Sequence, residues 1–215
     1  MIRTVNELVD RIAAELVWRR RELTDMRALV QESSGQLRCR VVIRAGVALL
    51  YAHWEGFVKA ASSHYLEFVA SHRIPYRDLT PNFVALTLRS KFSEMRASEK
   101  ISSANALADF FCTSLDAQSR IPYKNVVDTK SNLSSRVLLD IIAALGLDIR
   151  GFETRLNFID TNLVNPRNHI AHGEALELAV DEYLSLHDDV LGLIETFRNE
   201  IENSSILRRF ERNAA

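Results

Sequence analysis

The segment RNHIAHG, residues 167–173, places an arginine, an asparagine and two histidines within a few positions of one another. A guanidinium can bind a phosphate through two parallel hydrogen bonds, and an imidazole titrates near neutral pH. Arg167 and His172 therefore have the chemistry to cleave an RNA phosphodiester without a metal, because the 2'-hydroxyl of RNA is a built-in nucleophile. The protein then has to assist deprotonation of that hydroxyl, protonate the leaving 5'-oxygen and stabilise the charge on phosphorus.

The same residue types also fit simpler interpretations, namely a surface arginine and a histidine that caps a helix end. His169 and His172 form an HxxH pair that suggests a metal, but the sequence offers no third ligand at a supporting spacing. It also contains no Gly-rich phosphate loop, no GxSxG elbow and no carboxylate cluster of nuclease type. We therefore expect no metal and no cofactor.

Helix geometry separates the members of the motif. Arg167 and His172 are five residues apart, which is about 140° around an ideal helix. Asn168 and His172 are four apart, or about 40°, so Asn168 is better placed to touch His172. Arg167 would have to reach with its long side chain, or a second copy of the motif in a dimer would complete the site.

Two helix boundaries are compatible with the residues before the motif. Asn165 followed by Pro166 is a helix-start signal, with Asn as the N-cap and Pro at the first helical position. Arg167 and Asn168 would then lie in a first turn whose free N–H groups favour anions. The alternative is a longer helix that begins near Asp160 and is kinked at Pro166.

The rest of the chain must supply the elements that position this motif, and its pattern is helical. Apolar residues recur at spacings of three and four, and only seven glycines and four prolines interrupt them. No Pro/Gly-rich linker divides the chain, so we expect one all-α domain over residues 1–215. The predicted helices cover about 5–30, 37–71, 82–96, 102–114, 131–148 with a stop near Gly146, and 180–201. Residues 115–132 are predicted to be a long loop and SILRRFERNAA, at 205–215, a fraying tail.

Composition narrows the setting. The net charge of −1 gives no global basic field, so any RNA contact would come from a local patch. Cys39 and Cys112 have no ligand spacing and are expected to be reduced core residues of a cytoplasmic protein. The N-terminus lacks the order of a signal peptide, and the apolar run 41–54 is shorter than the roughly 18 residues of a spanning helix, so we expect no membrane. Arg19, Arg20 and Arg21 are assigned to the solvated face of the first helix.

Three longer segments are similar to one known family. They are YAHWEGFVK at 51–59, SNLSSRVLLDIIAALGLD at 131–148 and FIDTNLVNPRNHIAHG at 158–173. In order and spacing they resemble the MAE-type (RiboL-PSP) family of the HEPN superfamily of prokaryotic helical ribonucleases, and RNHIAH matches its RNxxxH motif. The resemblance spans most of the chain from residue 40 onward.

This resemblance implies a HEPN-type helical bundle, with long N-terminal helices and several shorter ones, that forms a homodimer in which two motifs face one cleft. It also implies metal-independent endonuclease activity on RNA in a toxin–antitoxin or phage-defence setting, with a cognate antitoxin or defence partner. Arg167 would be the phosphate and transition-state ligand, His172 the general acid/base, and Asn168 the polar residue that orients them. Position 169 varies in the motif, so His169 inherits no role and remains an auxiliary candidate.

Glu55 is the second auxiliary candidate, because the matching family segment also has WE at this point. Arg44 lies on the same helix face but about 16 Å away along the axis, so the two cannot pair. Either Glu55 pairs with Lys59 one turn later, or it acts beside the Arg167 cluster. For the chain as a whole, two rival hypotheses remain: a non-catalytic HEPN domain that binds RNA, nucleotides or a protein, and a helical interaction protein in which RNHIAHG merely ends a helix.

Overall fold

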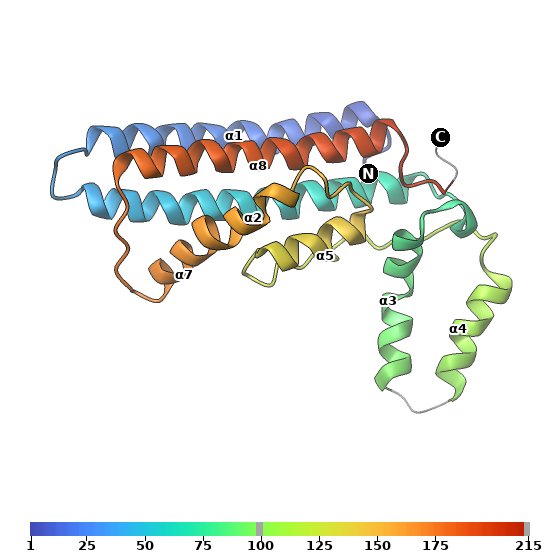
Figure 1. Cartoon of the computed structure of the whole chain (residues 1–215). Coiled ribbons are helices and arrows are strands. Elements are labelled where there is room, and N and C mark those ends of the chain that lie inside the picture. Colours follow the sequence, from blue (N-terminus) through green and yellow to red (C-terminus); the bar gives the residue numbers. More distant parts are fainter. Residues whose placement is uncertain (98–100, 213–215) are drawn as a thin grey trace.

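The computed structural model describes residues 1–97 and 101–212, and this part of the chain is built from helices (Figure 1). The α-helices are α1 (Val5–Glu32), α2 (Cys39–Ser71), α3 (Pro81–Ala97), α4 (Ile101–Thr113), α5 (Ser135–Leu145), α6 (Leu156–Phe158), α7 (Asn165–Ala171) and α8 (Val180–Ile206). Between them lie the 3-10 turns η1 (Tyr76–Asp78) and η2 (Glu153–Arg155) and the π-helical turn η3 (Ile159–Val164). Extended pairing within the described residues consists of two isolated bridges. The prediction of an all-α bundle with long N-terminal helices and several shorter ones is therefore confirmed.

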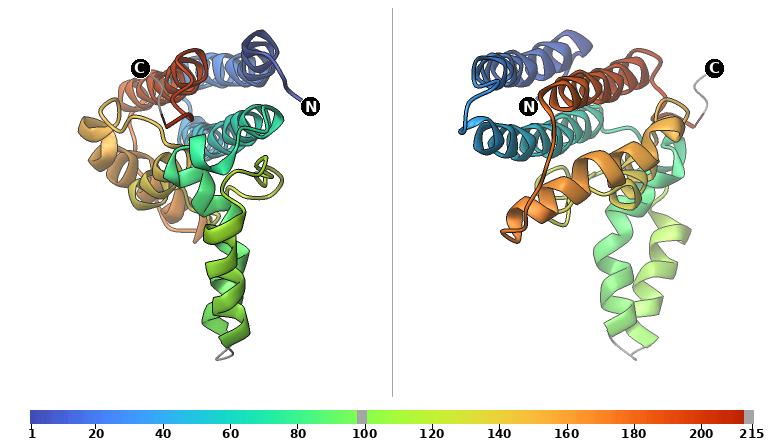
Figure 2. Two further views of the ribbon diagram at one scale, coloured as in Figure 1. Left: turned by 90° about the vertical axis from the view of Figure 1, so that its right-hand side faces the viewer. Right: turned by 60° about the vertical axis from the view of Figure 1, so that its left-hand side comes forward.

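Three long helices form the body of the molecule. α1, α2 and α8 run side by side, and α7 and α5 lie against the other side of α2 (Figures 1 and 2). Gly46 lets α2 and α8 approach closely, because a Cβ atom there would lie 2.6 Å from the ring of Tyr183. α2 is thus the central helix, and large side chains bury around it: Tyr51, Trp54, Phe57, Tyr65, Phe68 and, from α8, Tyr183 and Phe197.

Local signals set most helix ends. Thr4 and Glu7 form a capping box at the start of α1. Ser134 caps α5, and Gly146 ends it at a φ of 66°, a left-handed conformation that glycine adopts without a Cβ penalty. The predicted stop near Gly146 is confirmed, whereas the helix begins at Ser135 rather than at residue 131.

The assignment of the arginine run to solvent is wrong for Arg19. This residue lies three positions after Leu16 and four before Leu23, and therefore falls on the buried stripe of α1, where it is 6% exposed. Its guanidinium lies 4.2 Å from the ring centroid of Trp18 and pairs with Glu15. Stacking on Trp18 and pairing with Glu15 compensate the buried charge, although the Arg19 Nε has no hydrogen-bond partner among the described residues.

α3 and α4 form a hairpin that projects from the body (Figure 1). Both helices were predicted within one residue of their observed ends, and the predicted loop at 115–132 is also confirmed. The predicted fraying tail is wrong for residues 205–212. Phe210 is fully buried, its carbonyl accepts a hydrogen bond of 2.9 Å from the N–H of Thr80, and Glu211 forms a bridge with Leu79. The tail therefore closes over the base of the hairpin.

Two composition-based expectations also change. Cys39 is only half-buried and Cys112 is exposed on α4, so neither is a core residue. By length and composition α2 could cross a membrane, since one 18-residue window has a mean hydropathy of 1.3. Half of that window is buried inside the bundle, as in the core helix of a globular protein.

Candidate active site

The motif is carried on the last part of one irregular helical segment. α6 runs into η3, and η3 runs into α7 without a break, since Val164 and Asn165 both have right-handed helical dihedrals. The N–H of Asn165 donates to the carbonyl of Asp160, five residues back, which is the π-helical pattern. Pro166 explains this widening, because proline lacks an N–H and its ring clashes with the carbonyl four residues before it.

This geometry decides between the two predicted boundaries. The helix-start interpretation is wrong: Asn165 is not an N-cap, and Arg167 and Asn168 do not lie in a free first turn. The longer helix interrupted at Pro166 is the arrangement observed, with its start at Leu156 instead of Asp160. An anion at Arg167 would therefore be bound by side chains and not by a helix N-terminus.

Arg167 is half-buried and held by three groups. Its guanidinium carbon lies 4.4 Å from the ring centroid of Tyr51. Its Nη2 donates to the carbonyl of Ser131 at 3.0 Å, and its Nη1 donates to Oδ1 of Asn168 at 2.9 Å. A guanidinium has five N–H donors, so three remain for a phosphate. Arg167 is thus fixed in orientation and still able to bind an anion.

Tyr51 is the platform beneath Arg167. It is buried, and its hydroxyl accepts a hydrogen bond of 2.6 Å from the N–H of Leu133. Burial raises the pKa of Tyr51 to about 12, and the negative charge of Glu55 raises it as well, against the lowering effects of Leu133 and Arg167. The phenol therefore stays neutral at physiological pH and serves Arg167 through its ring.

The loop before α5 presents the carbonyl that binds Arg167. Lys130 and Ser131 both have positive φ, 58° and 53°, a conformation that costs non-glycine residues roughly 1–2 kcal/mol each. Asp160 of η3 holds the other end of this loop: its carboxylate accepts from the N–H of Ser135 at 2.8 Å and from the Ser135 hydroxyl at 2.5 Å. The strained carbonyl is thus fixed by the same helical segment that carries Arg167.

His172 lies at the end of α7 and is exposed. Gly173 follows it with a φ of 75°, and the N–H groups of Gly173 and Glu174 donate to the carbonyls of Ile170 and His169. These two bonds are the Schellman pattern, which positions His172 at the C-cap. The exposed His172 imidazole makes no hydrogen bond or ion pair with the described residues.

Asn168 does not join the two ends of the motif through its side chain. Its Oδ1 accepts from Arg167, while its backbone carbonyl accepts from the N–H of His172 at 3.0 Å. The expectation that Asn168 lies closer than Arg167 to His172 therefore holds only for the backbone. Within one chain, Arg167 and Asn168 are hydrogen-bonded, and among the described residues no hydrogen bond or ion pair links the His172 imidazole to either of them.

The auxiliary candidates take different places. His169 is exposed, and its Nδ1 lies 3.2 Å from a carboxylate oxygen of Glu174. Glu55 is half-buried one turn after Tyr51, whose pKa it raises, and it forms no ion pair with Lys59 although both lie in the described chain. Arg44 donates instead to the carbonyl of Glu174 at 2.5 Å. Glu55 thus belongs to the surroundings of Arg167, whereas His169 supports the chain after α7.

A metal centre finds no support in the described residues. Within residues 1–97 and 101–212, no three His, Cys, Asp or Glu side chains gather closely enough to hold an ion. In the HxxH pair, His169 lies beside one described carboxylate, that of Glu174.

The three segments singled out in the sequence meet at Arg167. Tyr51 comes from the first, Ser131 and Leu133 from the second, and Asp160 and Arg167 from the third. Tyr51 and Ser131 were not predicted as site residues. The available signal was that both lie inside the two other family-like segments.

Comparison with known proteins gives one result. The family model described as RiboL-PSP-HEPN matches residues 14–203, nearly the whole chain. A search of curated proteins found no match, and neither did a search of solved structures. The family match covers all three segments that meet at Arg167, and the chain therefore belongs to the RiboL-PSP family of the HEPN superfamily.

Proposed function

We propose that this protein is an endoribonuclease that cleaves RNA without a metal, acts as a homodimer, and serves a toxin–antitoxin or phage-defence system. The observation that supports it is a guanidinium held by Tyr51, Ser131 and Asn168 of which three N–H donors have no partner among the described residues. Such preorganised donors stabilise charge that develops on a phosphoryl group without reorganisation during the reaction. Family membership fits an RNase-like or nucleotide-binding role.

The chemistry assigned to the residues is simple. The 2'-oxygen attacks phosphorus, the bond between phosphorus and the 5'-oxygen breaks, and a 2',3'-cyclic phosphate forms. Either an imidazole takes the 2'-hydroxyl proton while water protonates the 5'-oxygen, or water takes the 2'-hydroxyl proton while an imidazolium protonates the 5'-oxygen. In both cases Arg167 balances the added negative charge. Because the exposed His172 imidazole forms no hydrogen bond with Arg167 in the described part of its own chain, we place the Arg167 of one protomer opposite the His172 of its partner.

Purified protein and labelled single-stranded RNA test the activity. We expect cleavage that persists in EDTA and stops when the scissile nucleotide is 2'-deoxy. His172→Ala should lower the rate by about 10²–10⁴-fold, the usual contribution of a general acid or base. His169→Ala is the matched control, an exposed histidine on the same short helix, and should cleave at close to the wild-type rate. A metal requirement, or equal loss in both histidine variants, would contradict the mechanism.

Heterodimers test the composite arrangement. Arg167→Ala and His172→Ala chains with different tags, purified as a mixed dimer, should contain one complete site of two and recover about half of the wild-type activity. Both homodimers should be inactive. A mixed dimer as inactive as its parents would mean that each chain builds its own site.

A second candidate function is a non-catalytic HEPN domain that binds RNA, nucleotides or a protein partner. It is favoured by the exposed His172 imidazole, which has no partner among the described groups to set its tautomer. RNA that is retained by the protein but never cleaved, in wild type and in His172→Ala alike, would select this candidate.

A further inference from the structure

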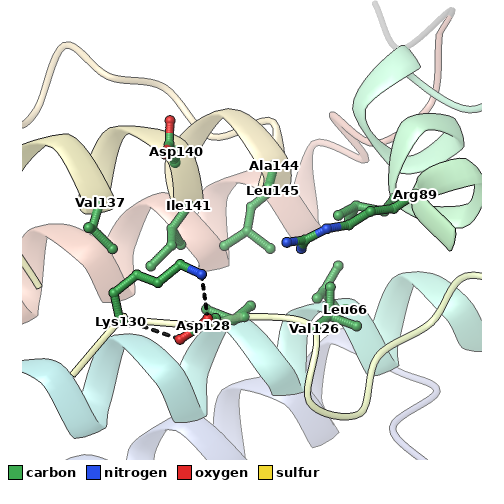
Figure 3. Close-up of a pocket in the computed structure, with 12 residues that line it drawn as sticks. Leu66, Arg89, Val126, Asp128, Lys130, Val137, Asp140, Ile141, Ala144 and Leu145 are labelled. Carbon is green, nitrogen blue, oxygen red and sulfur yellow. Dashed lines mark hydrogen bonds and ion pairs between the residues drawn. The ribbon is translucent and has the colours of Figure 1, made fainter. Parts of the chain in front are cut away.

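A small cavity lies behind the loop that binds Arg167. It has a volume of about 130 Å³ and opens between α2, α3, α5 and residues 126–130 (Figure 3). Its wall is aliphatic, formed by Leu66, Leu86, Val126, Val127, Val137, Ile141, Ala144 and Leu145. Its charged lining residues are Arg89, Lys130, Asp128 and Asp140: Arg89 and Lys130 extend toward the opening from opposite sides, and Asp128 pairs with Lys130 at 2.8 Å (Figure 3).

The size of the cavity restricts what could enter it. Pockets for drug-sized ligands hold about 300–1,000 Å³, so this one is too small for a whole nucleotide or a cofactor. It has room for a single planar ring, and the aliphatic side chains of the wall would contact the two faces of that ring. The rim groups have both signs, so they could bind the donors and acceptors on the edge of such a ring and the phosphate beside it.

The cavity and the Arg167 site share one loop. Lys130 lines the rim of the cavity, and the next residue, Ser131, gives Arg167 its carbonyl acceptor. Both residues have positive φ, so this turn is held in a strained conformation of a kind that clusters at binding and catalytic sites. Lys130 and Ser131 are consecutive, so one turn of the chain supplies both a rim residue of the cavity and the carbonyl that binds Arg167.

We propose that this cavity receives one unpaired base of the RNA strand whose phosphate Arg167 binds. The proposal rests on the proposed function for its ligand, and it makes single-stranded RNA the substrate class, because bases in a duplex cannot be splayed into a pocket. Lys130 and Arg89 bind the flanking backbone, and the aliphatic wall binds the faces of the base.

Filling the cavity tests this assignment. Ala144→Leu adds three carbons to the wall of the cavity, while Ala143→Leu makes the same change on the exposed face of α5. Both are placed in the His172→Ala background, so that bound RNA is not cut. The probes are labelled oligouridylate, oligoadenylate and an abasic ribose-phosphate oligomer of the same length, and dissociation constants are measured by fluorescence anisotropy.

We expect Ala144→Leu to weaken binding of at least one of the two base-containing oligomers by about fivefold to tenfold, near the lower end for loss of one bound base. The abasic oligomer should bind equally to all variants, and Ala143→Leu should behave as its parent. Melting temperatures identify a variant that has not folded, and Val126→Met then replaces Ala144→Leu as the filling change.

The other possible outcomes of the binding assay each contradict the base pocket, the nuclease or both. Unchanged binding by a folded filled variant overturns the base pocket, as does an equal loss for RNA and the abasic oligomer. Neither of these results affects the nuclease, which is measured separately as cleavage by wild type. A selective loss of base binding without any cleavage by wild type would keep the pocket and reject the nuclease. Absence of all RNA binding, together with no cleavage by wild type, would reject both.

Discussion

The contact between Arg167 and Tyr51 should be measurable as a coupling energy. A cation over an aromatic ring contributes about 0.5–1 kcal/mol at exposed sites and about 2 kcal/mol when desolvated. Arg167 is half-buried and lies 4.4 Å from the ring centroid, so we expect about 1 kcal/mol. A double-mutant cycle of Tyr51→Leu and Arg167→Ala isolates this term, because the bonds of Arg167 to Ser131 and Asn168 are lost equally on both sides of the cycle. The free energy of unfolding is measured by urea titration.

The hydroxyl of Tyr51 should have a separate effect. Tyr51→Phe keeps the ring but leaves the N–H of Leu133 without its acceptor, which should cost about 1–3 kcal/mol. Tyr183→Phe is the matched control, since the buried Tyr183 hydroxyl has no hydrogen-bond partner among the described groups. It should leave stability nearly unchanged. A coupling energy within the additivity error of about 0.5 kcal/mol, or equal losses from the two Tyr→Phe changes, would refute the proposed platform.

Three further changes probe the surroundings of the site. Gly173→Ala forces a side chain into a positive φ and should cost about 1–2 kcal/mol in urea unfolding; no loss would mean that α7 ends differently. Asp160→Ala removes two hydrogen bonds to Ser135 and should cost about 1.5–3 kcal/mol, whereas stability equal to wild type would show that the loop holds itself. Burial lowers the pKa of His53, with Glu22 opposing, so the unfolded chain binds a proton more readily than the folded one. The folded state therefore has its full stability, as far as His53 is concerned, above about pH 6.5, and it loses stability as the pH falls below that value. His53→Gln should reduce the decrease in the free energy of unfolding between about pH 7 and pH 5. An unchanged decrease in the variant would mean that other groups cause it.

The sequence alone predicted those parts of the fold that depend on contacts between residues close together in the chain. The boundaries of α3 and α4, the stop at Gly146 and the all-helical pattern follow from periodicity and caps within a few residues. Arg167 and His172 were singled out by residue type, and their roles remain predictions; the described residues show no hydrogen bond or ion pair between their side chains. The same local rules failed for Arg19, because its charge suggested solvent while its spacing from Leu16 and Leu23 placed it on the buried stripe.

The partners of Arg167 could not be predicted in this way. Tyr51 and Ser131 are far from it in sequence, and Tyr51 lies in an apolar run where it looks like an ordinary core aromatic. The carbonyl of Ser131 becomes an acceptor through backbone dihedrals, which no residue type encodes uniquely. At Asn165 and Pro166 a strong start signal was overridden, since the preceding residues were already helical.

The π turn η3 lets the chain accommodate one extra residue ahead of the motif. A one-residue insertion in a regular α-helix rotates everything after it by about 100°, which would turn Arg167 away from Tyr51. A π turn absorbs such an insertion, so the helix after it keeps its facing direction. Deleting one residue from η3 should therefore be tolerated only together with loss of Pro166, whose ring would otherwise clash inside the restored α-helix at about 3 kcal/mol. We therefore expect that the extra residue in η3 and Pro166 can be removed together but not singly without loss of stability.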